Sequence, residues 1–175
     1  VLATGTTVGQ NATTLVTEAD AVRDIAIAVG RFRIAKASGP VTATVGITPG
    51  LADSASTIAG ETVAHLRRHV ARFGPFPYPQ VAIVVLPDIS GGIEYPGVIF
   101  MSTRQDKDAT LSHELGHQWF YGLVGDDQAR DPWLDEGSAT YAESRFEHTE
   151  GSMRSRSIPS GGAGRVGEPM TYWEP

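Results

Sequence analysis

The sequence of 175 residues contains no cysteine. Disulfide bonds are therefore excluded, and any bound metal must be held by nitrogen and oxygen atoms rather than by thiolates. The absence of cysteine does not fix the compartment, because exported bacterial proteins can also lack it. The sequence has 41% hydrophobic and 19% charged residues, a composition typical of a soluble domain. A cytoplasmic and an extracytoplasmic location are both compatible with it.

Long apolar runs and an excess of positive charge are also lacking. No stretch approaches the roughly 18 to 20 apolar residues of a membrane span, and no secretory signal is recognisable at Val1. The formal net charge is −6 and there is no run of Lys or Arg. This pattern argues against nucleic acid and against an anionic membrane surface as partners.

The first part of the chain predicts β structure. Residues 1–21 are rich in Thr, Ala and Gly, and we expect an extended lead-in that could end an N-terminal β domain lying outside this sequence. From Val22, the segments RDIAIAVG, RFRIAKAS and VTATVGIT are each bounded by Gly or Pro, which predicts strands. Alternation in the first of them predicts that Ile25, Ile27 and Val29 form the buried face of a half-buried antiparallel strand.

A helix and two further strands follow. Residues 51–73 carry an apolar stripe at helical spacing and end at Gly74. The apolar run VAIVVL at 81–86 is typical of a central strand that is buried on both faces. Residues 97–101 predict an edge strand, because the preceding Pro96 cannot donate to a sheet ladder.

His65 and His69 are four residues apart in the predicted helix, a spacing that can bind a metal ion. No carboxylate lies between them, and their neighbours Arg67 and Arg68 would repel a cation. We therefore expect a solvated helix face here and not a metal site.

The stretch TLSHELGHQWFYG at 110–122 predicts a helix on which His113 and His117 share one face. Two imidazoles so placed can bind one ion, and Glu114 between them can take a proton from an attacking water. This is the HExxH pattern of zinc metallopeptidases. Zinc in a hydrolytic site has three protein ligands and one open position, so a third ligand is needed.

The candidate third ligand is Glu136, 19 residues after His117 in the segment PWLDEGSATYAE at 132–143. Asp131 as N-cap and Pro132 at the first helical position predict a second helix, which would return antiparallel to the first. Asp135 neighbours the ligand on this helix, so we expect it to point away from the metal.

The complete pattern, HELGH followed by eighteen residues and Glu136 within WLDEG, resembles the gluzincin aminopeptidases of the aminopeptidase N family. The resemblance implies an α+β, thermolysin-like zincin subdomain with a mainly antiparallel twisted sheet. It also implies zinc as cofactor, His113, His117 and Glu136 as its ligands, and Glu114 as general base.

A second motif, GGIEY at 91–95, resembles the Gly-x-Met-Glu-Asn segment that runs along the substrate cleft in this family. The resemblance makes Gly91, Gly92 and Glu94 substrate-binding residues, with Glu94 taking the free amino group of a peptide. Ile93 and Tyr95 stand where the family usually has Met and Asn, so the motif is a variant.

Glu143 follows Glu136 by seven residues and shares its helix face. Metal-binding imidazoles usually donate their second N–H to a carboxylate or carbonyl, and Glu143 is our candidate for that support. A solvated surface carboxylate is the alternative for this residue.

We expect residues 22–150 to form the peptidase subdomain and residues 151–175, rich in Ser, Gly and Arg, to form a flexible loop. In the family, a Tyr that hydrogen-bonds the oxyanion lies about sixty residues beyond the third ligand, on a helical subdomain. That position is beyond Pro175, and we do not assign the role to Tyr172. The resemblance therefore implies a C-terminal helical subdomain outside this sequence that completes the cleft.

Three functions are compatible with these motifs. The first is a zinc aminopeptidase that releases N-terminal residues from peptide substrates. The second is a thermolysin-like endopeptidase, which would have no need of an acidic group such as Glu94 to capture a substrate N-terminus. The third is a zinc-binding domain that is inactive in isolation, although a purely structural zinc site would not need Glu114.

Overall fold

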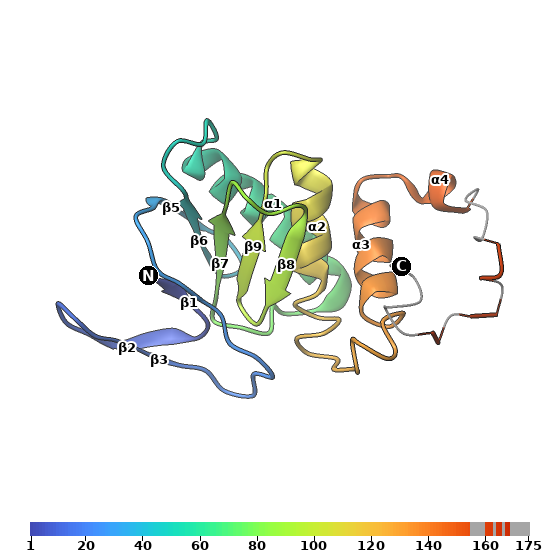
Figure 1. Ribbon diagram of the computed structural model, residues 1–175, viewed down its shortest axis with the longest axis horizontal. Coiled ribbons are helices and arrows are strands. Elements are labelled where there is room, and N and C mark those ends of the chain that lie inside the picture. The colour runs from blue at the N-terminus through green and yellow to red at the C-terminus, as the bar shows by residue number, and fades with distance from the viewer. Residues whose placement is uncertain (155–159, 163, 166, 169–175) are drawn as a thin grey trace.

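A five-stranded mixed sheet forms the centre of the computed structural model, which describes residues 1–154, 160–162, 164–165 and 167–168 (Figure 1). In spatial order the strands are β5 (Arg33–Ser38), β6 (Thr42–Ile47), β7 (Gln80–Val85), β9 (Val98–Met101) and β8 (Gly92–Tyr95). The β5–β6 and β8–β9 pairs are antiparallel, whereas β7 runs parallel to both of its neighbours. As predicted, β7 is central, and all of its residues from Val81 to Val85 are buried.

The α+β class is confirmed, and four of the six strand ladders in the described part of the chain are antiparallel. The parallel centre of the sheet follows from connectivity. A parallel pair needs a crossover, and α1 (Ala55–Phe73) supplies it between β6 and β7.

Helix α1 starts where Ser54 accepts a hydrogen bond from the backbone N–H of Thr57, and it ends at Gly74, whose φ is 95°. Its apolar stripe lies on one face of the sheet beside α2 (Lys107–Gly116) (Figure 1). Together they bury the main core, which consists of Ala43, Val45, Ile47, Ala55, Ile58, Ala59, Val63, Leu66, Phe76, Val81, Ile83, Val85, Ile99, Met101, Leu111, Leu115 and Trp119.

Helix α3 (Glu136–Phe146) packs against α2, its last residue Phe146 also contacts His69 of α1 with ring centroids 4.6 Å apart, and the short α4 (Glu150–Arg154) follows it (Figure 1). The two helices approach closely at Gly116, where a Cβ atom would lie only 3.2 Å from the Cα of Ala139. This close approach brings the start of α3 to the end of α2.

The opposite face of the sheet is covered by the N-terminal segment. Strand β1 (Leu2–Ala3) pairs with β4 (Ile27–Ala28), and β2 (Thr6–Gln10) forms a hairpin with β3 (Leu15–Glu18). A second, smaller core lies between the β1–β4 pair and the sheet, made of Leu2, Ala26, Ala28, Ala82, Val84 and Val98.

The predicted burial of Ile25, Ile27 and Val29 is wrong. These side chains are 61–77% exposed, while the alternate residues Ala26 and Ala28 are buried. Ala26 and Ala28 face the sheet and pack with Leu2 in the layer between them. Because successive side chains of a strand point to opposite sides, the branched residues face outward.

The predicted edge strand is also wrong. Strand β9 lies between β7 and β8, so the edge is β8, which carries Glu94. Pro96 occupies the turn of the β8–β9 hairpin, where no ladder hydrogen bond is required of it.

The expectation of a solvated face for His65 and His69 is contradicted, because both side chains are buried between α1 and its neighbours. His69 lies among aromatic rings, with ring centroids 4.6 Å from Phe146, 5.7 Å from Trp119 and 6.0 Å from Phe73. Burial lowers the pKa of His69 to about 4, so the ring is neutral near pH 7.

Residues 1–21 contain three short strands, whereas the sequence suggested an extended lead-in. The flexible loop predicted for 151–175 is wrong at its start, which belongs to α4. Most of that segment lies outside the described residues, and the domain boundaries stay a prediction. None of the helices in the described part of the chain combines the length and apolar character that a membrane-spanning helix requires.

Candidate metal centre

Helix α2 presents His113 and His117 on one face. The regular helix ends at Gly116, six residues before the predicted end, and turns follow it. His117 nevertheless keeps the helical register, since its backbone N–H donates to the carbonyl of His113 at 3.3 Å. The imidazoles therefore stay one turn apart, with Nε2 atoms separated by 3.0 Å.

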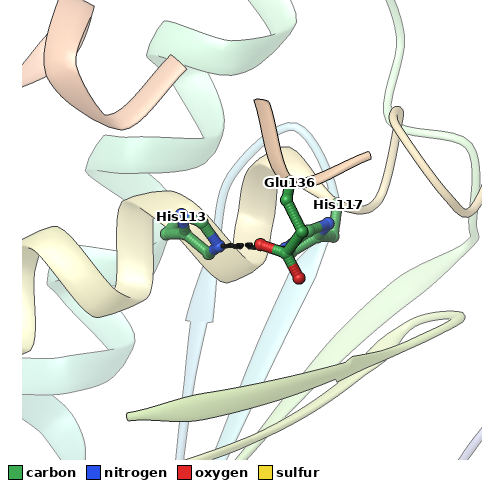
Figure 2. A group of neighbouring side chains, drawn as sticks. All are labelled: His113, His117 and Glu136. Carbon is green, nitrogen blue, oxygen red and sulfur yellow. Dashed lines mark hydrogen bonds and ion pairs between the residues drawn. The ribbon is translucent and has the colours of Figure 1, made fainter. Parts of the chain in front are cut away.

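Glu136 reaches this pair from the first turn of α3 (Figure 2). Its Oε2 lies 3.2 Å from Nε2 of His113 and 3.7 Å from Nε2 of His117. The helix was expected to start at Pro132 with Asp131 as its cap. Turns occupy 132–135 instead, and they place Glu136 at the very start of α3, facing α2.

The three donor atoms fit a tetrahedral metal ion. Ligands at about 2.0 to 2.1 Å from such an ion lie roughly 3.3 Å from one another, and the separations here are 3.0, 3.2 and 3.7 Å. The donors are two imidazole nitrogens and one carboxylate oxygen, a set that suits zinc and leaves a fourth position open.

Both imidazoles are oriented through their second nitrogens. Nδ1 of His113 lies 3.2 Å from Oε2 of Glu143, the residue proposed for this support from the sequence. Nδ1 of His117 is hydrogen-bonded to Oδ1 of Asp135, and both side chains are almost fully buried. Such contacts leave each Nε2 available to a metal.

The expectation that Asp135 points away from the site is therefore wrong. It rested on helical periodicity, but Asp135 precedes the first turn of α3 and is not bound by that geometry. A metal-binding imidazole that is buried needs a hydrogen-bond partner at its second nitrogen, and this need could have identified Asp135 as the partner of His117.

Glu114 lies beside the three donor atoms and is 5% exposed. Its Oε2 is buried without a hydrogen-bond partner among the described residues. Burial, opposed by the neighbouring His117 and His113, raises the pKa of Glu114 to about 7. A carboxyl group with this pKa can take up and release a proton near neutral pH.

The carboxylates around the histidines favour a cation at this position. Burial opposes a charge on His113, but hydrogen bonds with Glu136 and Glu143 outweigh it and raise the pKa of His113 to about 10. The hydrogen bond with His113 lowers the pKa of Glu136. The same negative charges that hold a proton there would attract a divalent ion.

The GGIEY segment consists of Gly91 and the edge strand β8, which borders this cluster. Gly92 packs against Glu114 so closely that a Cβ atom would lie 2.5 Å from its side chain, and Gly91 has a φ of 68°. Oε1 of Glu94 lies 2.7 Å from the side-chain nitrogen of Gln128. The structure thus brings the residues of both predicted motifs to one place.

Three contributing residues were not predicted from the sequence. Gln118 accepts a hydrogen bond from the backbone N–H of Gly97 at 2.9 Å and so fixes the β8–β9 turn to the end of α2. Gln128 contacts Glu94, and Arg23 holds the loop that carries Gln128. None of these belongs to a short motif, and their contacts depend on the folded chain.

Two antiparallel helices that bring two histidines and a glutamate together, beside a mixed sheet, are typical of the zincin class of metallopeptidases. Comparison with known proteins agrees, since the family model described as Peptidase family M1 domain matches residues 62–161, more than half of the sequence. The chain belongs to this family.

Three similar proteins illustrate the extent of the match. Aminopeptidase M1-D of Oryza sativa subsp. japonica is 33% identical over 82 residues, which cover 38% of this chain and 9% of the relative. Human Aminopeptidase N is 30% identical over 112 residues, which cover 55% of this chain and 11% of the relative. The third is the crystal structure of a mutant M1 zinc metallopeptidase from Deinococcus radiodurans bound to a Tyr-Ser-Ala substrate. It is 26% identical with a TM-score of 0.69, and the match covers 86% of this chain and 38% of that structure. The chain thus spans little more than a third of that structure.

Proposed function

We propose that this chain carries the catalytic centre of a zinc-dependent aminopeptidase. The observation that supports it best is the convergence of His113, His117 and Glu136, with donor atoms 3.0 to 3.7 Å apart, next to a buried Glu114. Zinc bound to these three residues would lower the pKa of a water molecule and polarise a peptide carbonyl.

Glu114 is the general base in this proposal. Its carboxylate takes a proton from the water that attacks the scissile carbonyl and passes a proton to the departing amine. Glu143 and Asp135 keep the two imidazoles in the tautomer and orientation that leave Nε2 toward the metal.

The substrate binds along β8. An edge strand has unpaired backbone groups that can accept an extended peptide by strand addition. Glu94 lies on this strand, and its carboxylate can form an ion pair with the α-ammonium group of the first residue. Gly91 and Gly92 are proposed to lie along the bound peptide, with Gly92 packed directly against Glu114. The complex of the Deinococcus metallopeptidase with a tripeptide supports a short peptide as ligand.

Besides the proposed zinc, a developing oxyanion needs a hydrogen-bond donor. We place that donor, and a helical subdomain closing the cleft, in the sequence that the longer relatives have in addition.

The test compares leucyl anilide with N-acetyl-leucyl anilide as substrates of the complete gene product that contains this sequence. We expect hydrolysis of the free amine only, and loss of this preference in Glu94→Ala. Equal turnover of both substrates would refute the aminopeptidase and favour an endopeptidase.

Zinc content after dialysis provides a second readout: one ion per chain, with sharply lower occupancy in Glu136→Ala. If that variant bound zinc as tightly as the parent, the assignment of the third ligand would be wrong. Zinc binding by the unmodified protein without any turnover would favour a binding domain.

A further inference from the structure

Gln128 bridges the two halves of the proposed site. It lies in the loop between α2 and α3, and its side-chain nitrogen is 2.7 Å from Oε1 of Glu94 and 2.5 Å from Oδ2 of Asp135. One carboxylate belongs to the edge strand that would hold the substrate amine, and the other is bonded to His117. No sequence motif marks Gln128.

Chemistry fixes the orientation of this amide. Ionised carboxylates only accept hydrogen bonds, so the NH₂ group of Gln128 must face both of them, with one N–H for each. Atoms of Glu94, Asp135 and His117 approach one another within 4.8 Å, close enough to suggest a second cation site. The amide of Gln128 already fills the space between the two carboxylates, and Nδ1 of His117 is engaged by Asp135, so we interpret this group as a hydrogen-bond network.

The fold holds Gln128 in place through Arg23. The guanidinium group of Arg23 donates to the carbonyl of Asp126 at 2.6 Å and to the carbonyl of Tyr121 at 3.3 Å, and it lies 4.6 Å above the ring of Tyr121. Tyr121 has a φ of 124°, a conformation that an L residue adopts only when its surroundings impose it. The loop therefore has a defined course at both ends of the segment before Gln128.

We propose that Gln128 is a positioning residue that couples recognition of the substrate amine to the metal centre. Its first N–H orients Glu94 and leaves Oε2 of that carboxylate for the α-ammonium group. Its second N–H holds Asp135 on His117 and so steadies the imidazole. This inference rests on the proposed aminopeptidase function for the role of Glu94, whereas the effect on His117 requires only that the site binds a metal.

The first test uses Gln128→Met, which keeps the length of the side chain and removes both donors. In the complete gene product we expect KM for leucyl anilide to rise about tenfold while kcat changes less than about threefold, because a hydrogen bond to a charged group is lost. Arg130→Met is the matched control, since the Arg130 side chain is in the same loop and 83% exposed. It should leave both constants unchanged.

A double-mutant cycle separates positioning from general damage to the fold. If Gln128 acts through Glu94, Gln128→Met should raise KM in the parent and have no further effect in Glu94→Ala. Equal effects in both backgrounds would overturn the proposal. If Glu94→Ala itself left the preference for a free amine unchanged, the proposed function would fail instead.

The second test measures zinc affinity in competition with a chelator and needs no turnover. We expect Gln128→Met to weaken zinc binding about tenfold and to add nothing to the loss caused by Asp135→Asn. Thermal unfolding of the zinc-free variants serves as a check that the fold is kept. Unchanged zinc affinity in a folded Gln128→Met protein would overturn the coupling.

Discussion

Glu114 shows at the scale of a single residue how burial prepares a carboxyl group for proton transfer. The pKa of Glu114 is raised to about 7 mainly because the side chain is removed from water. A general base must be deprotonated, so the rate should fall once the pH drops below the pKa of Glu114, which a bound zinc ion would lower from this metal-free value. We expect Glu114→Gln to lower kcat by about 10² to 10⁴ without loss of zinc. A pH–rate profile and metal analysis check both statements, and activity that survived the substitution would remove Glu114 from the mechanism.

His69 predicts a separate pH effect, on stability. Its pKa is lowered to about 4 by burial, which outweighs the opposing hydrogen bond to the His65 carbonyl, whereas an unfolded chain titrates near 6.5. Between these values the unfolded state binds the extra proton, so the free energy of unfolding should fall as the pH decreases from 6.5 to 4. The contribution approaches about 3 kcal/mol at the lower limit.

Urea unfolding of His69→Phe at several pH values measures this contribution. The variant should lose less stability between pH 6.5 and 4 than the parent, because Phe cannot bind the proton. His148→Asn is the control, since His148 is exposed and has a φ of 58°, which Asn tolerates. An identical pH dependence in the parent and His69→Phe would show that His69 is not the group responsible.

Single residues were predictable where a pattern specified chemistry and unpredictable where only packing did. The spacing of His113 and His117 follows from helix geometry, and Glu143 was found from the same periodicity. Asp135 and the buried pair His65 and His69 were misjudged, because burial depends on which helices come together and not on neighbours in the sequence.

Two helices define the site at the scale of elements, and Gly116 sets their separation. Gly116→Val should separate α2 from α3, cost about 1 to 3 kcal/mol of stability and weaken zinc binding, because Glu136 moves away from the imidazoles. Gly116→Ala places its Cβ 3.2 Å from the Cα of Ala139 and should have a smaller effect. Chelator competition and denaturant unfolding measure the two consequences.

Gly60 supplies the matched control for this prediction. It lies in the interior of α1, where a Cβ atom would meet nothing within 4 Å. Gly60→Ala should therefore stabilise the protein by about 1 kcal/mol and leave zinc affinity unchanged. A Gly116→Val protein that bound zinc like the parent would show that the spacing of the helices does not control the site.

Elements with a strong period were predicted well, and their neighbours in space were not. Helix α1 and strand β7 follow from apolar patterns in the sequence. The order of β8 and β9 could not be obtained in that way, because Pro96 excludes a ladder donor but does not specify which side of the hairpin joins β7. The start of α3 was placed four residues early, since Pro132 suits a turn as well as a first helical position.

At the scale of the whole molecule, the 175 residues contain the proposed metal ligands, and the proposed helical subdomain of the longer relatives would supply the second wall of the cleft. We expect the 175 residues alone to bind zinc and to hydrolyse leucyl anilide far more slowly than a full-length family member such as the Deinococcus radiodurans metallopeptidase. Loss of one oxyanion donor typically costs about 10² to 10³ in rate, and an open cleft admits water. Parallel assays of the two purified, zinc-loaded proteins would decide the matter, and comparable turnover would contradict the expectation.

Arg23 precedes the central sheet in the sequence but fastens the loop between α2 and α3. A shortened protein beginning at Arg31 would keep every proposed zinc ligand, Glu114 and Glu94, and therefore both sequence motifs. It would also release the loop that carries Gln128. The smallest unit that can be transplanted into another scaffold therefore includes the N-terminal segment, because Arg23 stabilises the loop beside the proposed metal centre.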